Sequence, residues 1–231
     1  MLEIKNFNFN YGSSQILFNV SIKAKKGSIT TLMGSNGVGK TSLLKCLSGS
    51  HKVQSGQYFL NKKNVFNLPS YMLAKLGVGY VPQGRFIFPL LTVRENLEIG
   101  FSCLDKKEWF IPDEIYGLFP ILKTMLDRRG GDLSGGQQQQ LAIARALITK
   151  PSLLLMDEPT EGIQPNIIKQ IGDVILYLKK EKKMTIFLVE QYFDFAFELS
   201  DYIYLMQRGK IIYEGKKIEL NKKKFKAQLS I

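Results

Sequence analysis

The stretch that decides the fold is Gly34-Ser35-Asn36-Gly37-Val38-Gly39-Lys40-Thr41, which fits the phosphate-binding loop pattern G-x-x-x-x-G-K-[ST]. Glycines let backbone N–H groups converge on phosphate oxygens, and the helix that follows directs its positive end at them. We expect Lys40 to neutralise the β- and γ-phosphates and Thr41 to offer a hydroxyl to Mg²⁺. A plain glycine-rich turn is the alternative. A predicted strand before the loop (28–33) and a predicted helix after it (42–47) favour the nucleotide site.

The composition is that of an ordinary globular protein, with 231 residues, 45% of them hydrophobic and 23% charged. No apolar run approaches the roughly 20 residues needed to cross a bilayer, and no secretory signal is visible after Met1. The two cysteines, Cys46 and Cys103, are far apart. A disulfide framework or zinc site is therefore not expected, and a reducing compartment is.

The net charge of +12 favours polyanions such as nucleic acid, nucleotide phosphates or an anionic membrane. The lysines are scattered, however, and no aromatic residues interleave with them as a base-stacking platform requires. We interpret most of the excess as a solvated surface. Whether the lysine-rich C-terminal tail, with Lys222, Lys223 and Lys224, forms an amphipathic helix stays open.

The rest of the chain alternates between strand-like and helical stretches. Residues 2–9 and 18–22 alternate apolar with polar side chains, which predicts half-buried strands. Residues 84–150 have helical periodicity and are interpreted as an insertion. Buried strands are predicted at 153–156 and 185–189, with a helix at 167–178 between them, which makes a parallel βαβ unit. A terminal hairpin is predicted over 202–213.

Two acids, Asp157 and Glu158, end the apolar run Leu153–Met156. A buried strand with a polar exit is the structural alternative. In open α/β sheets, however, ligands bind at the carboxyl ends of the strands. With the phosphate-binding loop upstream, we expect Asp157 to face Mg²⁺ and Glu158 to orient or deprotonate the attacking water.

A third motif, Leu133-Ser134-Gly135-Gly136-Gln137, precedes a predicted long helix, where a simple N-cap is the alternative explanation. The phosphate-binding loop, this LSGGQ motif and the Asp-Glu pair, in that order, resemble the nucleotide-binding subunit of an ATP-binding cassette (ABC) transporter. The resemblance covers essentially the whole chain. It implies that the LSGGQ motif contacts ATP held by a second subunit, so that two ATP molecules lie in a head-to-tail dimer.

The resemblance assigns further residues. Tyr11 stands where the family places an aromatic ring under adenine, although a strand-edge tyrosine is the alternative. Gln83 matches the glutamine that reaches Mg²⁺ or water and links to the membrane subunits. Residues Glu161 to Gln164 occupy the loop at the dimer seam, where Gln164 replaces the usual aspartate.

The family's switch histidine is replaced by Gln191, which can hydrogen-bond a γ-phosphate but carries no proton at neutral pH. The one histidine, His51, is expected on the surface. A switch glutamine resembles the ATPases of the branched-chain amino acid importer group. Three runs resemble its urea-transporter branch more: Gly131–Gln140, Glu158–Pro165 and Val189–Ala196.

The expected fold is therefore an α/β P-loop NTPase (RecA-like) core, residues 1–83 and 151–231, with an N-terminal antiparallel β subdomain and an inserted α-helical subdomain, residues 84–150. The expected catalytic residues are Lys40, Glu158 and Gln191, and the expected Mg²⁺ ligands are Thr41, Gln83 and Asp157. The expected ATP-binding residues are Tyr11, Gly34, Ser35, Asn36, Gly37, Val38, Gly39, Lys40, Thr41, Ser42 and Gln83, and those reaching the partner's ATP are Ser134, Gly135, Gly136 and Gln137.

The function predicted from the resemblance is ATP hydrolysis that powers an importer, with urea as the expected solute and branched-chain amino acids as the alternative. A different class, a soluble ABC-type ATPase acting on nucleic acid or ribosomes, usually has two cassettes in one chain or a long coiled coil, and this chain has neither. The expected partners are a homo- or heterodimeric ATPase subunit, two permease subunits and, indirectly, an extracytoplasmic solute-binding protein. No nucleic acid is expected. The expected place is the cytoplasmic face of the inner membrane, peripherally bound.

Overall fold

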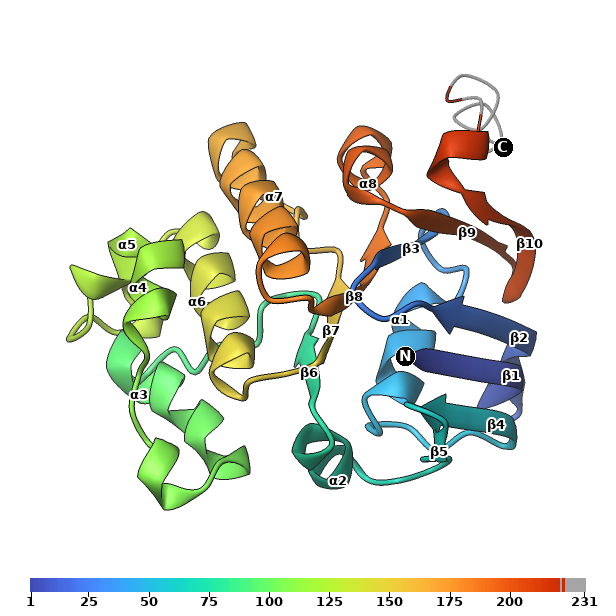
Figure 1. Cartoon of the computed structure of the whole chain (residues 1–231), viewed down its shortest axis with the longest axis horizontal. Coiled ribbons are helices and arrows are strands. Elements are labelled where there is room, and N and C mark those ends of the chain that lie inside the picture. Colours follow the sequence, from blue (N-terminus) through green and yellow to red (C-terminus); the bar gives the residue numbers. More distant parts are fainter. Residues whose placement is uncertain (221, 223–231) are drawn as a thin grey trace.

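The computed structural model describes residues 1–220 and 222, so Lys223 and Lys224 of the basic tail lie outside the described residues. Its strands form two sheets, and helices lie against and between them (Figure 1). The strands are β1 (Leu2–Tyr11), β2 (Ser14–Ala24), β3 (Ile29–Met33), β4 (Ser55–Leu60), β5 (Lys63–Asn64), β6 (Val78–Val81), β7 (Leu153–Asp157), β8 (Thr185–Glu190), β9 (Tyr202–Gln207) and β10 (Lys210–Lys216). The α-helices are α1 (Lys40–Leu47), α2 (Ser70–Lys75), α3 (Val93–Glu98), α4 (Asp113–Leu118), α5 (Pro120–Lys123), α6 (Gly135–Ile148), α7 (Pro165–Lys180) and α8 (Phe193–Leu199).

The larger sheet has the strand order β10-β9-β3-β8-β7-β6. All neighbours in it pair in parallel except β9 and β10, which form the predicted terminal hairpin. The predicted βαβ unit is also confirmed, since α7 connects β7 to β8 and the two strands pair in parallel. The carboxyl ends of β3, β8 and β7 consequently lie side by side.

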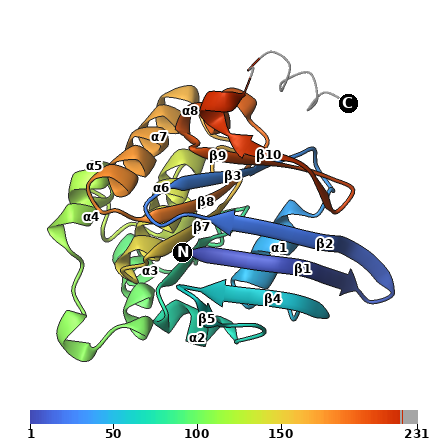
Figure 2. The ribbon, with the colours of Figure 1, turned by 45° about the vertical axis from the view of Figure 1, so that its right-hand side comes forward.

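The smaller sheet, β2-β1-β4-β5, is antiparallel and confirms the predicted N-terminal β subdomain. Figure 2 shows it as a separate layer, and Figure 1 shows α1 between it and the larger sheet. Strand β4 pairs with β1 in the register Leu2↔Leu60 to Asn8↔Ser55, so the third strand of this layer comes from a distant segment. No sequence pattern predicted β4, β5 or α2.

Side chains alternate between the two faces of the buried strands. Leu153 and Leu155 of β7 belong to the core that includes α1 and the antiparallel sheet. Leu154 and Met156 point to the opposite core, which α6 and α7 complete. Because both faces are covered, the strands are almost wholly apolar and are rigid supports for the loops at their ends.

The helices α3 to α6 all fall between β6 and β7 and form a group at one end of the molecule, in the left part of Figure 1. Helix α6 contacts β6 and thereby connects this group to the larger sheet. Among the described residues, no helix combines the length and apolar character that crossing a membrane requires.

Candidate active site

The phosphate-binding loop connects β3 to α1 at the carboxyl edge of the larger sheet. Gly39 caps α1 with φ 109°, a backbone conformation that residues with a Cβ rarely adopt. Gly34 is required for another reason, because a Cβ there would come within 2.5 Å of the Met206 carbonyl oxygen of β9. The loop is thus held close to its neighbours, with the positive end of α1 beneath it.

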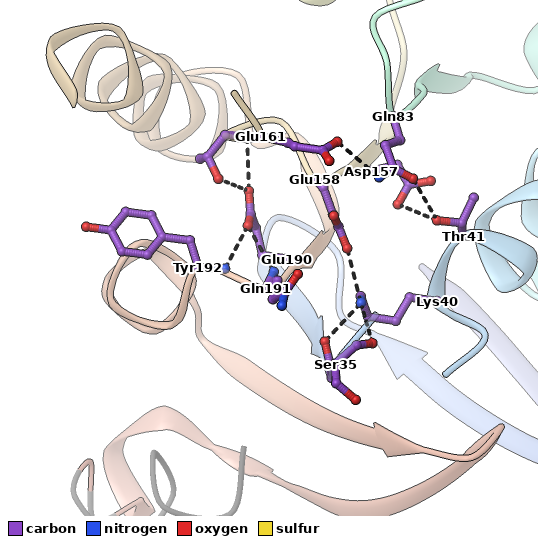
Figure 3. Close-up of polar contacts among 12 residues, drawn as sticks. Ser35, Lys40, Thr41, Gln83, Asp157, Glu158, Glu161, Glu190, Gln191 and Tyr192 are labelled. Atoms are coloured by element: carbon purple, nitrogen blue, oxygen red, sulfur yellow. Dashed lines mark hydrogen bonds and ion pairs between the residues drawn. The ribbon is translucent and has the colours of Figure 1, made fainter. Parts of the chain in front are cut away.

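Lys40 lies under this loop and is only 4% exposed. Its ammonium donates hydrogen bonds to the carbonyl oxygens of Gly34 and Ser35, both at 2.9 Å. It also forms an ion pair of 3.1 Å with Glu158 (Figure 3). Phosphate oxygens that enter the loop would therefore compete with Glu158 for the same ammonium.

Oxygen atoms from three elements gather next to Lys40. The Thr41 hydroxyl lies 3.2 Å from Oδ1 of Asp157 and 3.5 Å from Oε1 of Gln83. Oδ2 of Asp157 is buried and has no hydrogen-bond partner among the described residues. Burial raises the pKa of Asp157 to about 6. A hydroxyl, an amide oxygen and a carboxylate with a free oxygen are the ligands that suit Mg²⁺, so these residues fit the predicted metal site.

Glu158 is buried and has the positive φ of 45°. For a residue other than glycine this is an unfavourable backbone conformation, and such conformations cluster at functional sites. The N–H of Glu158 donates to the carbonyl oxygen of Val189 at 2.9 Å, which ties the turn after β7 to the neighbouring strand β8. The turn aims the carboxylate back at Lys40 rather than onward along the chain (Figure 3).

Gln191 follows β8 and is exposed. It lines, with Glu158, Thr160 and Tyr192, a hollow of about 400 Å³. The loop after β7 also reaches Gln83, whose amide donates to Glu161 at 3.0 Å. The structure thus brings the predicted residues Lys40, Thr41, Gln83, Asp157, Glu158 and Gln191 to one edge of the sheet.

Tyr11 lies at the end of β1 and is 56% exposed. Its hydroxyl is 3.2 Å from Nε2 of His51, and the His51 ring stacks on Phe9 with 5.4 Å between centroids. His51, expected on the surface, is therefore half-buried and supports Tyr11 from the side. The exposed tyrosine ring offers a flat surface that could stack on a base.

The LSGGQ motif stands at the start of α6. Ser134 caps the helix in a capping box with Gln137, as the simple N-cap alternative requires. Gly135 packs against the guanidinium of Arg85, where a Cβ would lie 3.0 Å from a terminal nitrogen. In Figures 1 and 2, α6 lies with the helical group, away from α1. The structure therefore does not bring the motif to this chain's own phosphate-binding loop.

Sequence reasoning missed one buried acid at the same edge, Glu190, the last residue of β8. It is 1% exposed, and burial raises the pKa of its carboxyl to about 7. The sequence does contain a signal for this residue, because Glu190 is a charged residue that directly follows the apolar run Ile186–Val189.

Comparison with known proteins places this arrangement in a family. A family model described as ABC transporter matches residues 17–161. The chain belongs to the ABC transporter family. It is an ATPase, an ATP-binding cassette whose hydrolysis of ATP drives transport, and the fold and activity predicted from the sequence are confirmed.

Two relatives are similar over nearly their whole length. The high-affinity branched-chain amino acid transport ATP-binding protein BraG of Pseudomonas aeruginosa is 43% identical over 213 residues, 92% of this chain and 91% of that protein. The probable branched-chain amino acid transport ATP-binding protein LivF of Archaeoglobus fulgidus is 42% identical over 223 residues, 95% of this chain and 94% of that protein. Among solved structures, the dimeric structure of MJ0796, a bacterial ABC transporter cassette, superimposes with a TM-score of 0.85 and 26% identity, and covers 94% of this chain and 99% of that one.

Proposed function

We propose that this cassette powers an importer of branched-chain amino acids, and that the residues at the carboxyl edge of the sheet hydrolyse the ATP. The observation that carries the catalytic part is the contact of the acid pair with the phosphate-binding loop: Glu158 with Lys40 at 3.1 Å and Asp157 with Thr41 at 3.2 Å. Both transport relatives above have names that specify branched-chain amino acids, and neither name mentions urea. They therefore support our alternative solute better than urea.

The roles of the residues follow from their positions. Lys40 and the loop amides hold the β- and γ-phosphates, and Tyr11 stacks on the adenine. Thr41, Gln83 and Asp157 hold Mg²⁺, and the chemistry that this ion supplies when bound is neutralisation of phosphate charge. Glu158 accepts a proton from the attacking water, and Gln191 orients that water or Glu158 across the hollow that both line.

A second cassette completes the site. Ser134, Gly135, Gly136 and Gln137 lie away from this chain's own phosphate-binding loop, so they act on ATP held by a partner subunit. The dimeric structure of MJ0796 supports such an arrangement, and a homodimer and a heterodimer both satisfy it.

Permease subunits dock between the sheet and the helical group, and an extracytoplasmic solute-binding protein delivers the solute to them. A hollow of about 260 Å³ there is lined by Tyr80, Ile99 and Arg145 among others. Nη1 of Arg145 is buried without a hydrogen-bond partner among the described residues. The adjacent segment 86–90 exposes apolar side chains, including Leu90 at 79%. These features suit a peripheral protein on the cytoplasmic face of the inner membrane.

The test measures uptake of labelled leucine and labelled urea in source cells that lack this chain. Leucine uptake should be lost while urea uptake persists. The wild-type chain should restore leucine uptake, and Glu158→Gln should not. Loss of urea uptake with leucine uptake intact would reverse the choice of solute, and uptake of both solutes without this chain would refute an importer role for either.

A further inference from the structure

Glu190 is a buried carboxylate next to the site, and it accepts four hydrogen bonds. Oε1 accepts from the hydroxyl of Thr160 at 2.8 Å and from its backbone N–H at 3.2 Å. Oε2 accepts from the backbone N–H groups of Gln191 at 3.0 Å and Tyr192 at 3.1 Å (Figure 3). One side chain therefore satisfies donors from two separate segments.

The two segments are those that carry Glu158 and Gln191. Thr160 stands two residues after Glu158, and Gln191 and Tyr192 begin the segment that follows β8. A further bond, from the N–H of Glu158 to the carbonyl oxygen of Val189 at 2.9 Å, joins the same segments. Glu190 thus ties the loop after Glu158 to the backbone from which the Gln191 side chain extends.

The chemistry of the contact suits a carboxyl group that accepts hydrogen bonds on both oxygens. All four partners are donors, and a carboxylate offers acceptor sites on both oxygens. A glutamine of the same size would present its NH₂ group to one pair of donors. An apolar residue would leave three backbone N–H groups, of which that of Thr160 is buried, without the acceptor they now have.

We propose that Glu190 is a positioning residue for ATP hydrolysis: by bonding both segments, it holds Gln191 in the orientation from which it serves Glu158. This inference rests on the proposed roles of Glu158 and Gln191. Glu190 itself contacts no part of the phosphate-binding loop in the interactions above, and it acts through Gln191. Its loss should therefore change the rate of hydrolysis more than the affinity for ATP.

The experiment compares single-turnover ATP hydrolysis and ATP affinity in the assembled transporter for Glu190→Gln and wild type. Hydrogen bonds to charged groups are strong enough that losing one pair should slow hydrolysis roughly ten- to a hundredfold. ATP affinity should stay within about threefold, because the residues that hold the phosphates are untouched. Thr160→Val, which removes only the hydroxyl, should slow hydrolysis less, and Thr160→Ser should restore it. Glu181→Gln, at an exposed acid after α7, is the matched control.

A double-mutant comparison separates positioning from general support of the fold. In a Gln191→Ala background, Glu190→Gln should cause little further slowing, because the side chain that it positions is gone. Equal slowing in both backgrounds, wild-type hydrolysis by Glu190→Gln, or a loss of ATP affinity as large as the loss of rate would each overturn the inference. If Glu158→Gln hydrolyses normally in the same assay, the proposed function fails instead.

Discussion

Replacing Glu158 by glutamine removes one charge from the most buried ion pair of the site. Lys40 is 4% exposed and Glu158 8% exposed, and the two side chains are 3.1 Å apart. The change keeps the shape and one oxygen acceptor but removes the carboxylate that we propose as the acceptor of the proton from water. It therefore tests the base and the ion pair together, and the two effects appear in different measurements.

The expected size of each effect follows from the geometry. Loss of a general base slows hydrolysis about 10²- to 10⁴-fold, which raises the barrier by about 3 to 5 kcal/mol. The nucleotide-free protein should also lose roughly 1 to 3 kcal/mol of stability. That is less than for a fully unpaired buried charge, because Lys40 keeps its two carbonyl acceptors and an amide oxygen. ATP supplies new anions to Lys40, so ATP affinity should be unchanged or higher.

Single-turnover hydrolysis in the assembled complex measures the first effect, and thermal unfolding with and without ATP measures the second. We expect Glu158→Gln to melt below wild type without nucleotide, to recover most of the difference with ATP, and to accumulate an ATP-bound dimer. Glu181→Gln, at an exposed site, should match wild type in every measurement. Near-wild-type turnover by Glu158→Gln would refute the assignment of the base, and weaker ATP binding would refute the competition for Lys40.

Three further predictions concern Lys40, Gln191 and the two buried acids with raised pKa values. Lys40→Ala should weaken ATP binding itself by at least about tenfold, because a cation that faces the phosphates is lost. Circular dichroism should show an intact fold, and undiminished ATP binding by calorimetry would contradict this prediction. Gln191→Ala should slow hydrolysis more than it weakens ATP binding, whereas Gln191→His should stay partly active. An alanine variant that hydrolyses ATP as fast as wild type would show that Gln191 has no role in hydrolysis. Burial raises the carboxyl pKa of Asp157 to about 6 and that of Glu190 to about 7, so the folded protein binds protons that the unfolded chain has released. Stability should therefore fall as pH rises from about 4 to 7, by up to about 3 kcal/mol for each group, and Glu190→Gln should lose its share of this slope in unfolding measurements without Mg²⁺ or nucleotide.

The parts of the fold that could be predicted are those that local sequence patterns specify. The phosphate-binding loop defines its own strand and helix, and the apolar runs of β7 and β8 on either side of the α7 pattern define a parallel unit. Strand β4 could not be predicted in this way, because Ser55-Gly56-Gln57 begins it with polar and flexible residues. Its pairing partner β1 lies about fifty residues earlier, and the backbone hydrogen bonds between them leave no periodic signal in the sequence.

The same distinction applies to the site. The Thr41 hydroxyl and the Asp157 carboxylate are 116 residues apart in sequence, yet their meeting was predictable. Asp157 ends β7, and the phosphate-binding loop leads from the carboxyl end of β3 in the same sheet to Thr41 at the start of α1. The contact of Glu190 with Thr160 was not predictable from such a rule. It depends on the turn that Glu158 makes with its φ of 45°, and no pattern in the sequence specifies a positive φ at a glutamate.

The glutamine at the switch position has a consequence for how the site handles protons. An amide cannot take or give a proton near neutral pH, so Gln191 can contribute only by its position and its hydrogen bonds. Position is what the surrounding structure controls, because the backbone N–H of Gln191 is bonded to the buried carboxylate of Glu190. Of the acids that line the same hollow as Gln191, Glu158 is the one paired with Lys40 of the phosphate-binding loop, so it is our proposed acceptor for the proton from the attacking water. With these proposed roles, hydrolysis depends on the relative placement of two neighbouring strand ends, since Glu158 follows β7 and Gln191 follows β8.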